Sequence, residues 1–164
     1  MTLTLEQVQE LLAYNSATGA FIWRAQRGTA VPGRLAGSVE KDGYRRIKIY
    51  RKHYQASHLA WLLTTGTWPQ NQIDHINGER DDNRIANLRE ATSSQNHGNS
   101  RFMRNSKALY KGITAARNGR WVARIGAGAS GRQQHLGTFD TPEAAHNAYC
   151  EAAQRRFGEF WRPA

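Results

Sequence analysis

Residues 73–96 read IDHINGERDDNRIANLREATSSQN, and they predict a strand, a long turn, a second strand and a helix. The first apolar run ends in an acid and a histidine, Asp74 and His75. A polar turn with an Asn-Gly pair follows, and the stretch closes with Thr92-Ser-Ser-Gln, which has the spacing of a capping box at a helix start. We expect this order to bring Asp74 against Asn96 in the first turn of the helix.

These residue types suit hydrolysis of a phosphodiester bond. The carboxylate of Asp74 and the amide oxygen of Asn96 are hard ligands that fit Mg²⁺ or Mn²⁺. His75 can act as general base toward water, because the unperturbed pKa of histidine lies near neutrality. Asn87 can use its amide to fix the backbone that carries His75. The spacing alone leaves a second interpretation open, a surface hairpin with solvated acids and an ordinary Asn-Gly turn.

The pattern D-H-I-N-G-x-x-x-D-N-R-x-x-N-L-R-x-A-T-x-x-Q-N resembles the HNH endonucleases of the homing and phage type. The resemblance implies a ββα-metal motif that cuts DNA, here over residues 73–101. By the same resemblance His75 and Asn87 take the catalytic positions, and Asp74 and Asn96 take the metal-ligand positions.

Composition favours a polyanionic partner. The chain has 164 residues, a formal net charge of +10 and one cysteine, Cys150, so it can form no internal disulfide. The N-terminus is amphipathic and acidic, unlike a signal peptide, and no apolar run reaches the length of a membrane span. We expect a soluble cytoplasmic protein, in the host cytoplasm if a phage encodes it.

Charge is unevenly distributed along the chain. Residues 20–60 hold nine Lys and Arg against two acids, a local charge of +7. Residues 74–90 hold five acids against three Arg, a local −2, and residues 107–164 hold nine basic against four acidic residues, a local +5. An acidic island between basic flanks is typical of a metal pocket set in a DNA-binding surface.

Before the motif, the pattern predicts a helix over 5–14, a strand over 20–24 and a long loop over 25–38. Apolar and basic residues then largely alternate over 44–50, and Arg51-Lys52 is expected to turn the chain into a second strand over 53–56, which predicts a β-hairpin with a basic face. We expect Arg45 and Lys48 on that face to contact DNA. A helix capped by Ser57 should follow and end at Gly66, and Trp23 is expected to anchor the core.

Residues 98–108 show no apolar period, so we place a domain boundary there, with one domain over 1–106 and a second over 107–164. Arg101 and Arg104 in this polar segment are further candidates for DNA contact.

The second domain should be a three-stranded antiparallel sheet backed by one helix. Strands are predicted near 110–116, 120–125 and 132–136, with Asn118-Gly119 as the first turn. Thr141-Pro142 predicts the start of the helix and Gly158 its end.

The stretch Y-K-G-I-x(7)-R-W-V-A-R-I…L-G-T-F-D-T-P-E-A-A-x-x-A-Y-x-x-A-A is similar to the plant ethylene-response-factor (APETALA-type) DNA-binding domain. That resemblance implies a sheet laid in the major groove. Thr114, Ala116, Arg124 and His135 depart from the plant pattern, so the plant target sequence is not implied. The candidate DNA contacts in this domain are Lys111, Arg117, Arg120, Trp121, Arg124, Arg132 and Gln134.

Together these features predict an α+β, two-domain, metal-dependent DNA endonuclease that uses Mg²⁺ or Mn²⁺ and acts on double-stranded DNA as a monomer. Nicking and double-strand cutting both remain open. The first alternative is a DNA-binding regulator that retains the nuclease fold without cleaving. An RNA-binding accessory protein is a third class, but it gains nothing from the acid, histidine and two asparagines of the motif.

Overall fold

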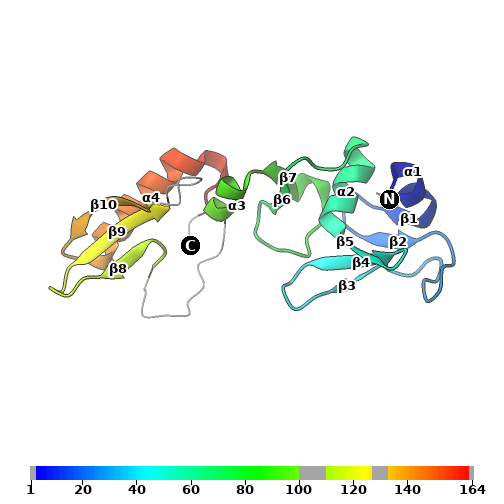
Figure 1. Cartoon of the computed structure of the whole chain (residues 1–164), viewed down its shortest axis with the longest axis horizontal. Helices are drawn as coiled ribbons and strands as arrows, with labels where there is room; N and C mark the ends of the chain where they lie inside the picture. Colours follow the sequence, from blue (N-terminus) through cyan, green and yellow to red (C-terminus); the bar gives the residue numbers. More distant parts are fainter. Residues whose placement is uncertain (1–2, 100–109, 127–132, 163–164) are drawn as a thin grey trace. The chain divides into compact units, whose positions relative to one another are not determined.

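The computed structural model describes residues 3–99, 110–126 and 133–162, which form two compact units, Met1–Ala91 and Thr92–Ala164 (Figure 1). Several small antiparallel sheets and four α-helices make up these units, so the prediction of a mixed α and β chain is confirmed. The predicted boundary between residues 106 and 107 lies outside the described residues and stays a prediction. Each unit is described here by itself.

The N-terminal unit begins with helix α1, Leu5–Leu11, whose Thr4 and Gln7 form a reciprocal capping box. The predicted helix over 5–14 is too long, because Leu12–Tyr14 is strand β1 and pairs with β2, Phe21–Trp23. Leu12 lies opposite Trp23 in that pair and is 1% exposed. Pairing with β2 therefore buries Leu12 and satisfies its backbone, which outweighs the helical spacing of the apolar residues.

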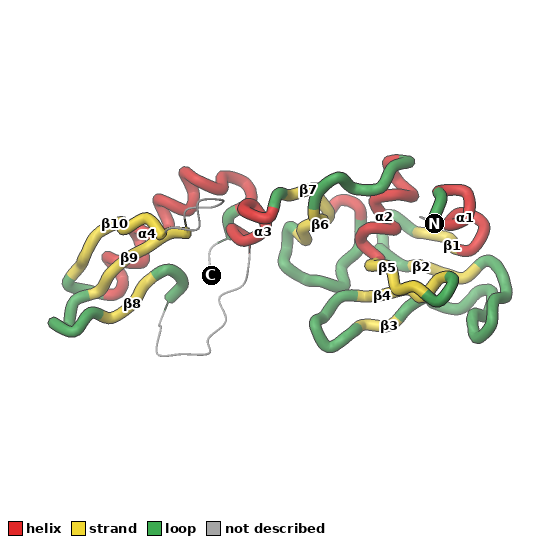
Figure 2. Tube along the Cα trace, viewed as in Figure 1, coloured by secondary structure: helices red, strands yellow, loops and turns green. Residues whose placement is uncertain are grey.

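A three-stranded antiparallel sheet follows, made of β3 (Ser38–Val39), β4 (Arg45–Ile49) and β5 (Lys52–Gln55). The predicted hairpin is present, but its turn is Tyr50-Arg51 rather than Arg51-Lys52, because Lys52 pairs with Ile49. Strand β3 was not predicted. Ile47 and Ile49 of β4 are buried and Lys48 between them is exposed, as alternation in a strand requires. Figure 2 shows that much of this unit is loop between short strands.

Helix α2, Ala56–Thr65, ends at Gly66, whose φ of 81° is the left-handed cap expected of glycine. Its N-cap residue is Gln55, and Ser57 lies buried inside the first turn, so the prediction that Ser57 caps the helix is wrong. Helix α2 buries Leu59 and Leu62 in the core of the unit. Trp23 packs against that core while remaining partly exposed.

The predicted two-strand motif is present as β6, Gln72–His75, and β7, Leu88–Ala91, with the short 3₁₀ helix η1, Ile85–Asn87, just before β7. Ile73 and Leu88 belong to the same core as Leu59 and Leu62 of α2. The strand ends that carry the polar residues are therefore anchored to the centre of the unit.

The C-terminal unit contains α3 (Ser93–Asn99), a sheet of β8 (Ile113–Ala115), β9 (Trp121–Gly126) and β10 (Gln133–Phe139), helix α4 (Pro142–Phe157) and the 3₁₀ helix η3 (Gly158–Phe160). The sheet order is β10-β9-β8, all antiparallel, and α4 covers one face (Figure 1). Thr141 accepts from the Ala144 amide and Gly158 ends α4, in agreement with the predicted helix bounds.

Small residues let α4 lie close to this sheet. Ala145 of the helix packs with Ile113 and Ala123 of the strands. Gly112 has a φ of 79°, and a Cβ added there would lie 2.1 Å from the ring of Tyr149. Both its conformation and this close approach require glycine. No helix in the described part of the chain is long and apolar enough to cross a membrane.

Candidate functional site

The β6–β7 hairpin holds the acid and the histidine of the motif at the end of a buried strand. Asp74 lies opposite Arg89 and His75 opposite Leu88 in the strand register. Asp74 is 3% exposed and His75 is 4% exposed, although both side chains are polar. Buried polar groups require partners, so the neighbours of these two side chains define what the site can do.

Arg89 is the cationic partner of Asp74. Its Nε donates to Oδ2 of Asp74 at 2.9 Å, and its Nη2 lies 2.9 Å from the same oxygen. Because the two residues are directly opposite in the hairpin, the strand register itself places the guanidinium on the carboxylate. A carboxylate offers about four acceptor sites, which exceeds the two N–H donors supplied by Arg89.

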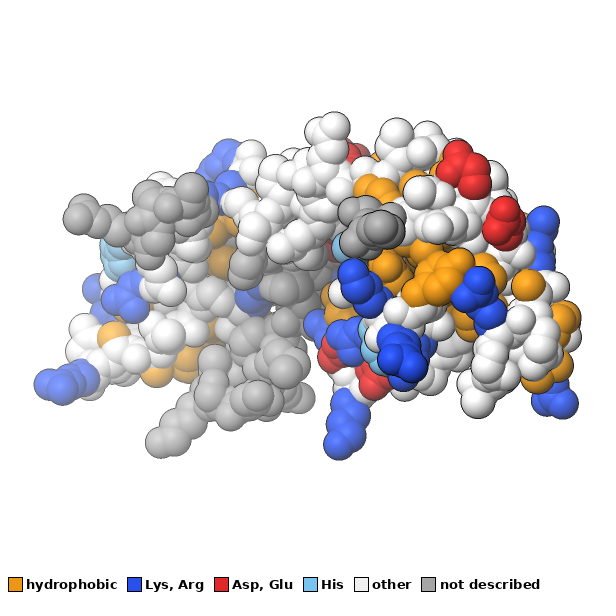
Figure 3. Space-filling view, turned by 45° about the vertical axis from the view of Figure 1, so that its right-hand side comes forward, with side chains coloured by type: hydrophobic (Ala, Val, Ile, Leu, Met, Phe, Trp, Pro, Cys, Tyr) orange, Lys and Arg blue, Asp and Glu red, His pale blue; other side chains and the backbone are white. Residues whose placement is uncertain are grey.

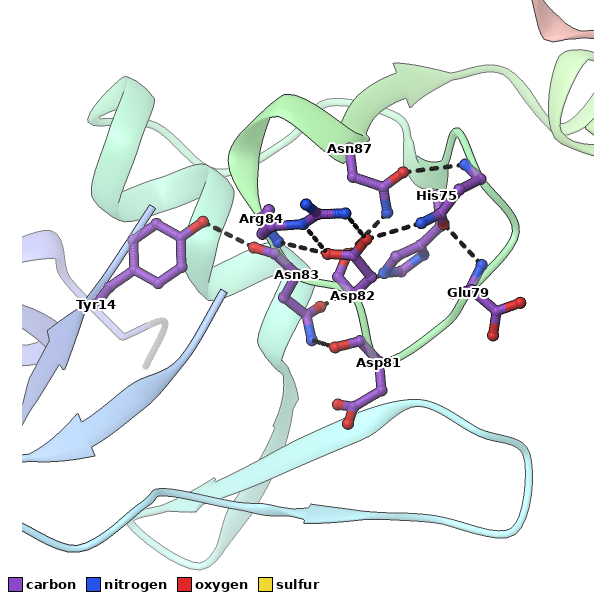
Figure 4. A network of polar contacts seen from close by, with 9 residues as sticks. Tyr14, His75, Glu79, Asp81, Asp82, Asn83, Arg84 and Asn87 are labelled. Carbon is purple, nitrogen blue, oxygen red and sulfur yellow. Dashed lines mark hydrogen bonds and ion pairs between the residues drawn. The ribbon is translucent and has the colours of Figure 1, made fainter. Parts of the chain in front are cut away.

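Asn87 closes the loop between the strands, with its side chain directed into that loop (Figure 4). Its Oδ1 accepts from the Asn77 amide at 3.0 Å, and its Nδ2 donates to the Asp82 carbonyl at 2.9 Å. The Asn87 carbonyl also accepts from the Ile76 amide at 2.9 Å. Asn87 thus fixes the backbone directly after His75, which is the geometry expected of a residue that orients the His75 segment.

Asp82 organises the polar side of the same loop. Its Oδ2 accepts from Nδ2 of Asn77 at 2.7 Å, and its carboxylate takes both Nε and Nη2 of Arg84, at 2.8 and 2.6 Å. The Arg84 contact is the main reason that the pKa of Asp82 falls to about 2. Asp82 is therefore ionised and engaged in the loop.

Asn83 connects His75 to the rest of the unit. Its side chain is 1% exposed, its Nδ2 donates to the Asp81 carbonyl at 3.0 Å, and its Oδ1 lies 3.4 Å from Nε2 of His75. An amide oxygen only accepts, so this contact requires the proton of neutral His75 on Nε2. The lone pair of the imidazole is then on Nδ1.

Residues far away in the sequence hold Asn83 in place. The Tyr14 hydroxyl donates to the Asn83 carbonyl at 2.7 Å, 69 residues along the chain (Figure 4). Gly19, with a φ of 74°, lies so close that an added Cβ would be 2.7 Å from the backbone at Asn83 and Arg84. The motif loop therefore packs directly against the turn after β1.

The opposite side of the loop is fastened to the β3–β4 sheet. Nε and Nη2 of Arg45 donate to the two carboxylate oxygens of Asp81 at 2.8 and 2.9 Å. Arg80 donates to the Asp42 carbonyl at 2.7 Å, and its guanidinium lies 5.0 Å from the centre of the Tyr44 ring. The loop thus has anchors on two sides besides its own hydrogen bonds.

Burial lowers the pKa of His75 below 6.5 against the opposing effects of Asn83 and of the Asp74 and Asp82 charges. A lowered pKa keeps the imidazole neutral at pH 7, the form that accepts a proton. The Tyr44 ring lies 5.8 Å from the His75 ring, centre to centre. Burial and the charge of His75 also lower the pKa of His58 on α2.

Asn96 lies in the first turn of α3, in the C-terminal unit, where its amide donates to the Thr92 carbonyl at 3.0 Å. Thr92 and Gln95 form the capping contacts that the sequence predicts for this helix. Within the described ranges no three His, Cys, Asp or Glu side chains gather as a metal site. Asp74 belongs to the N-terminal unit and Asn96 to the C-terminal unit, so their predicted pairing as metal ligands stays a prediction. Carboxylate and amide oxygens are donors that fit Mg²⁺ or Mn²⁺ better than Zn²⁺.

In the C-terminal unit, Arg117, Arg124 and Gln134 are exposed. Trp121 lies on the face of the sheet that packs against α4, which assigns its ring to packing. Arg120 is exposed but engaged, with Nε 2.9 Å from Oδ1 of Asp140 and Nη2 donating to the Thr138 carbonyl.

The other predicted contacts differ in their surroundings. Lys111 is half-buried, its ammonium donates to the Gly98 carbonyl, and burial lowers its pKa. In the N-terminal unit Lys48 is exposed, whereas Arg45 is engaged with Asp81. Arg101, Arg104 and Arg132 lie outside the described residues.

Neither Asn83 nor Tyr14 was among the predicted site residues, and Arg89 was not expected to pair with Asp74. The D-N-R triplet contains Asn83, but its contact with His75 depends on how the loop folds. The Arg89 partnership could have been found, because an antiparallel hairpin from 73 to 90 places positions 74 and 89 opposite each other.

Residues 54–97 match the family model of the HNH endonucleases. This match spans the end of β5, all of α2 and the whole β6–β7 hairpin with its loop, and it contains Asp74, His75, Asn87 and Asn96. The resemblance drawn from the motif is confirmed over these residues.

The chain is also similar to plant AP2-like proteins, which confirms the second resemblance. It is 35% identical over 137 residues to AP2-like ethylene-responsive transcription factor AIL5 of Arabidopsis thaliana, an alignment covering 82% of this chain and 24% of that protein. With the factor PLT2 of the same plant it shares 34% identity over 141 residues, or 82% of this chain and 23% of the relative. Dehydration-responsive element-binding protein 2D of Arabidopsis thaliana is 41% identical over 54 residues, which is 33% of this chain and 26% of that protein. The chain thus spans about a quarter of the length of these relatives.

Proposed function

We propose that this chain is a metal-dependent endonuclease that hydrolyses phosphodiester bonds in double-stranded DNA. The observation that carries the proposal is the buried Asp74-His75 pair at the end of β6, inside a segment that matches the HNH endonucleases. Burial of an acid and a neutral imidazole at consecutive strand positions is costly for folding, and buried titratable groups of this kind are typical of functional sites.

His75 takes the proton of the attacking water in this proposal. The Asn83 contact to Nε2 directs the lone pair to Nδ1, so Nδ1 is the atom that accepts the proton. Burial keeps the ring neutral at pH 7, and neutral histidine is the competent base. The Asn87 hydrogen bonds to the loop backbone support the position of the ring.

Asp74 and Asn96 would hold Mg²⁺ or Mn²⁺ through oxygen atoms. When bound, such a cation stabilises negative charge at the scissile phosphate and at the leaving oxygen. Arg89 keeps the Asp74 carboxylate in one orientation through its two contacts to Oδ2. Neither His97 nor Cys150 is a metal ligand in this proposal.

The C-terminal unit would supply much of the DNA affinity and place the target. Its relatives are named as transcription factors and as an element-binding protein, which supports DNA as its partner. Arg117, Arg124 and Gln134 are exposed candidates for this contact. We propose that the chain acts as a monomer on DNA, in the cytoplasm, as a site-specific nuclease of the homing or phage type.

The names of the plant relatives favour one alternative, a DNA-binding regulator that retains the nuclease fold without cutting. Both functions require DNA binding, so binding alone does not separate them. The ionised, loop-engaged Asp82 and the packed Asn83 fit either function, since both residues hold the loop.

Incubation of supercoiled plasmid DNA with the purified protein and Mg²⁺ separates the two functions. A nuclease produces open-circular or linear DNA, whereas a regulator leaves the plasmid supercoiled while retarding it on a gel. His75→Ala and an EDTA reaction are the matched controls, and both should leave the plasmid intact. Cleavage that persists in His75→Ala at the wild-type rate would rule out His75 as the base, and absence of cleavage by a DNA-bound wild type would favour the regulator.

A further inference from the structure

The tip of the β4–β5 hairpin is built from residues that disfavour its geometry. Ile49 pairs with Lys52, so only Tyr50 and Arg51 connect the two strands. Both have positive φ, 48° for Tyr50 and 67° for Arg51. A two-residue turn with positive φ at both positions favours Asn-Gly, because a Cβ in this region clashes with its own backbone. The tip therefore carries backbone strain that a different sequence would relieve.

Core packing does not explain this choice of residues. The Tyr50 side chain is 46% exposed, and Arg51 is exposed as well. The guanidinium of Arg27 lies 4.3 Å from the centre of the Tyr50 ring, so a cation lies against this exposed tyrosine. Residues that hold a strained backbone without being buried are more often kept because their side chains make a functional contact.

Positive charge gathers at this end of the hairpin. Four exposed cations lie on the tip, the strands beside it and the loop over Tyr50, namely Arg27, Lys48, Arg51 and Lys52. In the part of the chain that the structure describes, none of the four forms an ion pair. Figure 3 shows Lys and Arg side chains spread over the surface of this unit.

The other end of the same sheet is different. Arg45 is paired with Asp81, and Arg46 is paired with Asp42 at 2.5 Å. Those two arginines hold the motif loop and the turn before β4, so their charge is compensated within the protein. Among the residues that the structure describes, no ion pair joins an acid to the cations near the tip, so their charge is left for a partner.

We propose that the β4–β5 tip is a second DNA contact, in which Arg27, Lys48, Arg51 and Lys52 bind backbone phosphates and Tyr50 packs on a sugar or base. The proposal rests on the proposed function, because it takes DNA as the partner. An aromatic ring beside cations suits a nucleic acid, whose phosphates alternate with apolar sugar and base faces. The contact uses the backbone and therefore adds affinity without sequence preference.

The test is a variant whose turn residues should stabilise the protein and weaken its binding to DNA. Tyr50→Asn/Arg51→Gly installs the residues that the geometry favours, so its melting temperature should rise by about 2–8 °C. Its affinity for a 30-base-pair DNA duplex of arbitrary sequence, measured in EDTA to prevent cutting, should fall. Loss of one phosphate contact lowers the slope of log affinity against log salt by about 0.9, or about eightfold in affinity at 0.1 M salt.

A second variant keeps the test independent of the turn. Lys48→Gln/Lys52→Gln leaves Tyr50 and Arg51 in place and should lower the salt slope by about 1.8. Lys41→Gln is the matched control, because Lys41 is exposed in the turn at the opposite end of β4. It should leave the salt slope within error of wild type.

The outcomes distinguish this proposal from the proposed function. If wild type binds the duplex and both tip variants keep its affinity and salt slope, the tip proposal is overturned and the proposed function stands. If wild type fails to bind the duplex but binds anionic lipid vesicles, both are overturned. A destabilised Tyr50→Asn/Arg51→Gly protein would overturn the strain argument, and Lys48→Gln/Lys52→Gln would then decide whether the tip binds DNA.

Discussion

Arg89→Met tests how strongly the Asp74 carboxylate depends on its partner in the hairpin. The two side chains are 15% and 4% exposed, so solvent contributes little compensation at this pair. Removing one member of a buried ion pair costs about 3–5 kcal/mol, because the remaining charge stays in a medium of low polarity. At about 2–4 °C per kcal/mol for a chain of this size, the melting temperature should fall by about 6–20 °C.

The loss should concentrate in the N-terminal unit, since β6, β7 and their core belong to it. We would follow thermal unfolding by tryptophan fluorescence and amide hydrogen exchange over residues 72–91. Arg84→Met is the comparison variant, because the Arg84 side chain is 51% exposed and that of its partner Asp82 is 17% exposed. Solvent screens this pair more than the Arg89–Asp74 pair, so Arg84→Met should lose less stability than Arg89→Met.

Addition of Mn²⁺ gives a second measurement of the same pair. A cation that binds the Asp74 carboxylate stabilises the fold by mass action, and the gain should be larger in Arg89→Met, where it replaces a lost positive charge. Two results would refute this reasoning: an Arg89→Met protein that melts within 2 °C or so of wild type, or one that melts equally low with and without Mn²⁺ while wild type responds to the ion.

His75→Ala should lower the cleavage rate by about 10²- to 10⁴-fold and leave DNA affinity nearly unchanged, as single-turnover cleavage and gel retardation would show. Asn83→Ala should destabilise the protein by about 1–3 kcal/mol and slow cleavage, because buried His75 loses its contact at Nε2; urea unfolding that matches wild type would contradict this. Burial raises the pKa of Tyr14 to about 12, so between pH 10 and 12 the unfolded chain releases a proton that the folded chain keeps, and stability falls as pH rises. Tyr14→Phe should remove that part of the alkaline loss in paired urea titrations. Cleavage should proceed with Mg²⁺ and Mn²⁺, cease in EDTA and gain little from Zn²⁺, whereas Asn96→His should shift preference toward Zn²⁺, Ni²⁺ or Co²⁺; a wild type that prefers Zn²⁺ would exclude the two-oxygen ligand set.

Local patterns predicted most of the regular structure, and apart from the Ser57 cap the errors in the helices and strands occur where distant partners decide. The helix predicted over 5–14 ends at Leu11, because Leu12 is opposite Trp23 in a two-strand sheet that no local period reveals. Strand β3 has two residues and follows a long loop, so it has no periodicity of its own. Capping boxes, by contrast, are local, and those at Thr4 and Thr92 were predicted with the correct residues.

The same distinction applies to the site. Asp74, His75 and Asn87 were chosen on their chemistry and on the resemblance, and the structure brings them to one hairpin and its loop. The fate of Arg45 could not be predicted, since its alternating position in β4 suits an exposed DNA contact equally well. Only the folded loop, which presents both Asp81 oxygens to the guanidinium, shows that this arginine is engaged inside the protein.

The contact from the Tyr14 hydroxyl to the Asn83 carbonyl has a consequence for how short a fragment of this protein can hold the motif in place. The matched segment begins at residue 54, yet the loop that positions His75 sits on a turn near residue 19 and on the sheet at Arg45. A peptide of residues 54–97 would keep every residue of the motif from Asp74 to Asn96 but lose the supporting contacts near residue 19 and at Arg45. We therefore expect it to be inactive and largely unfolded. Grafting the signature into another protein would meet the same obstacle. During synthesis the residues around Gly19 and Arg45 leave the ribosome before the motif loop that packs on them.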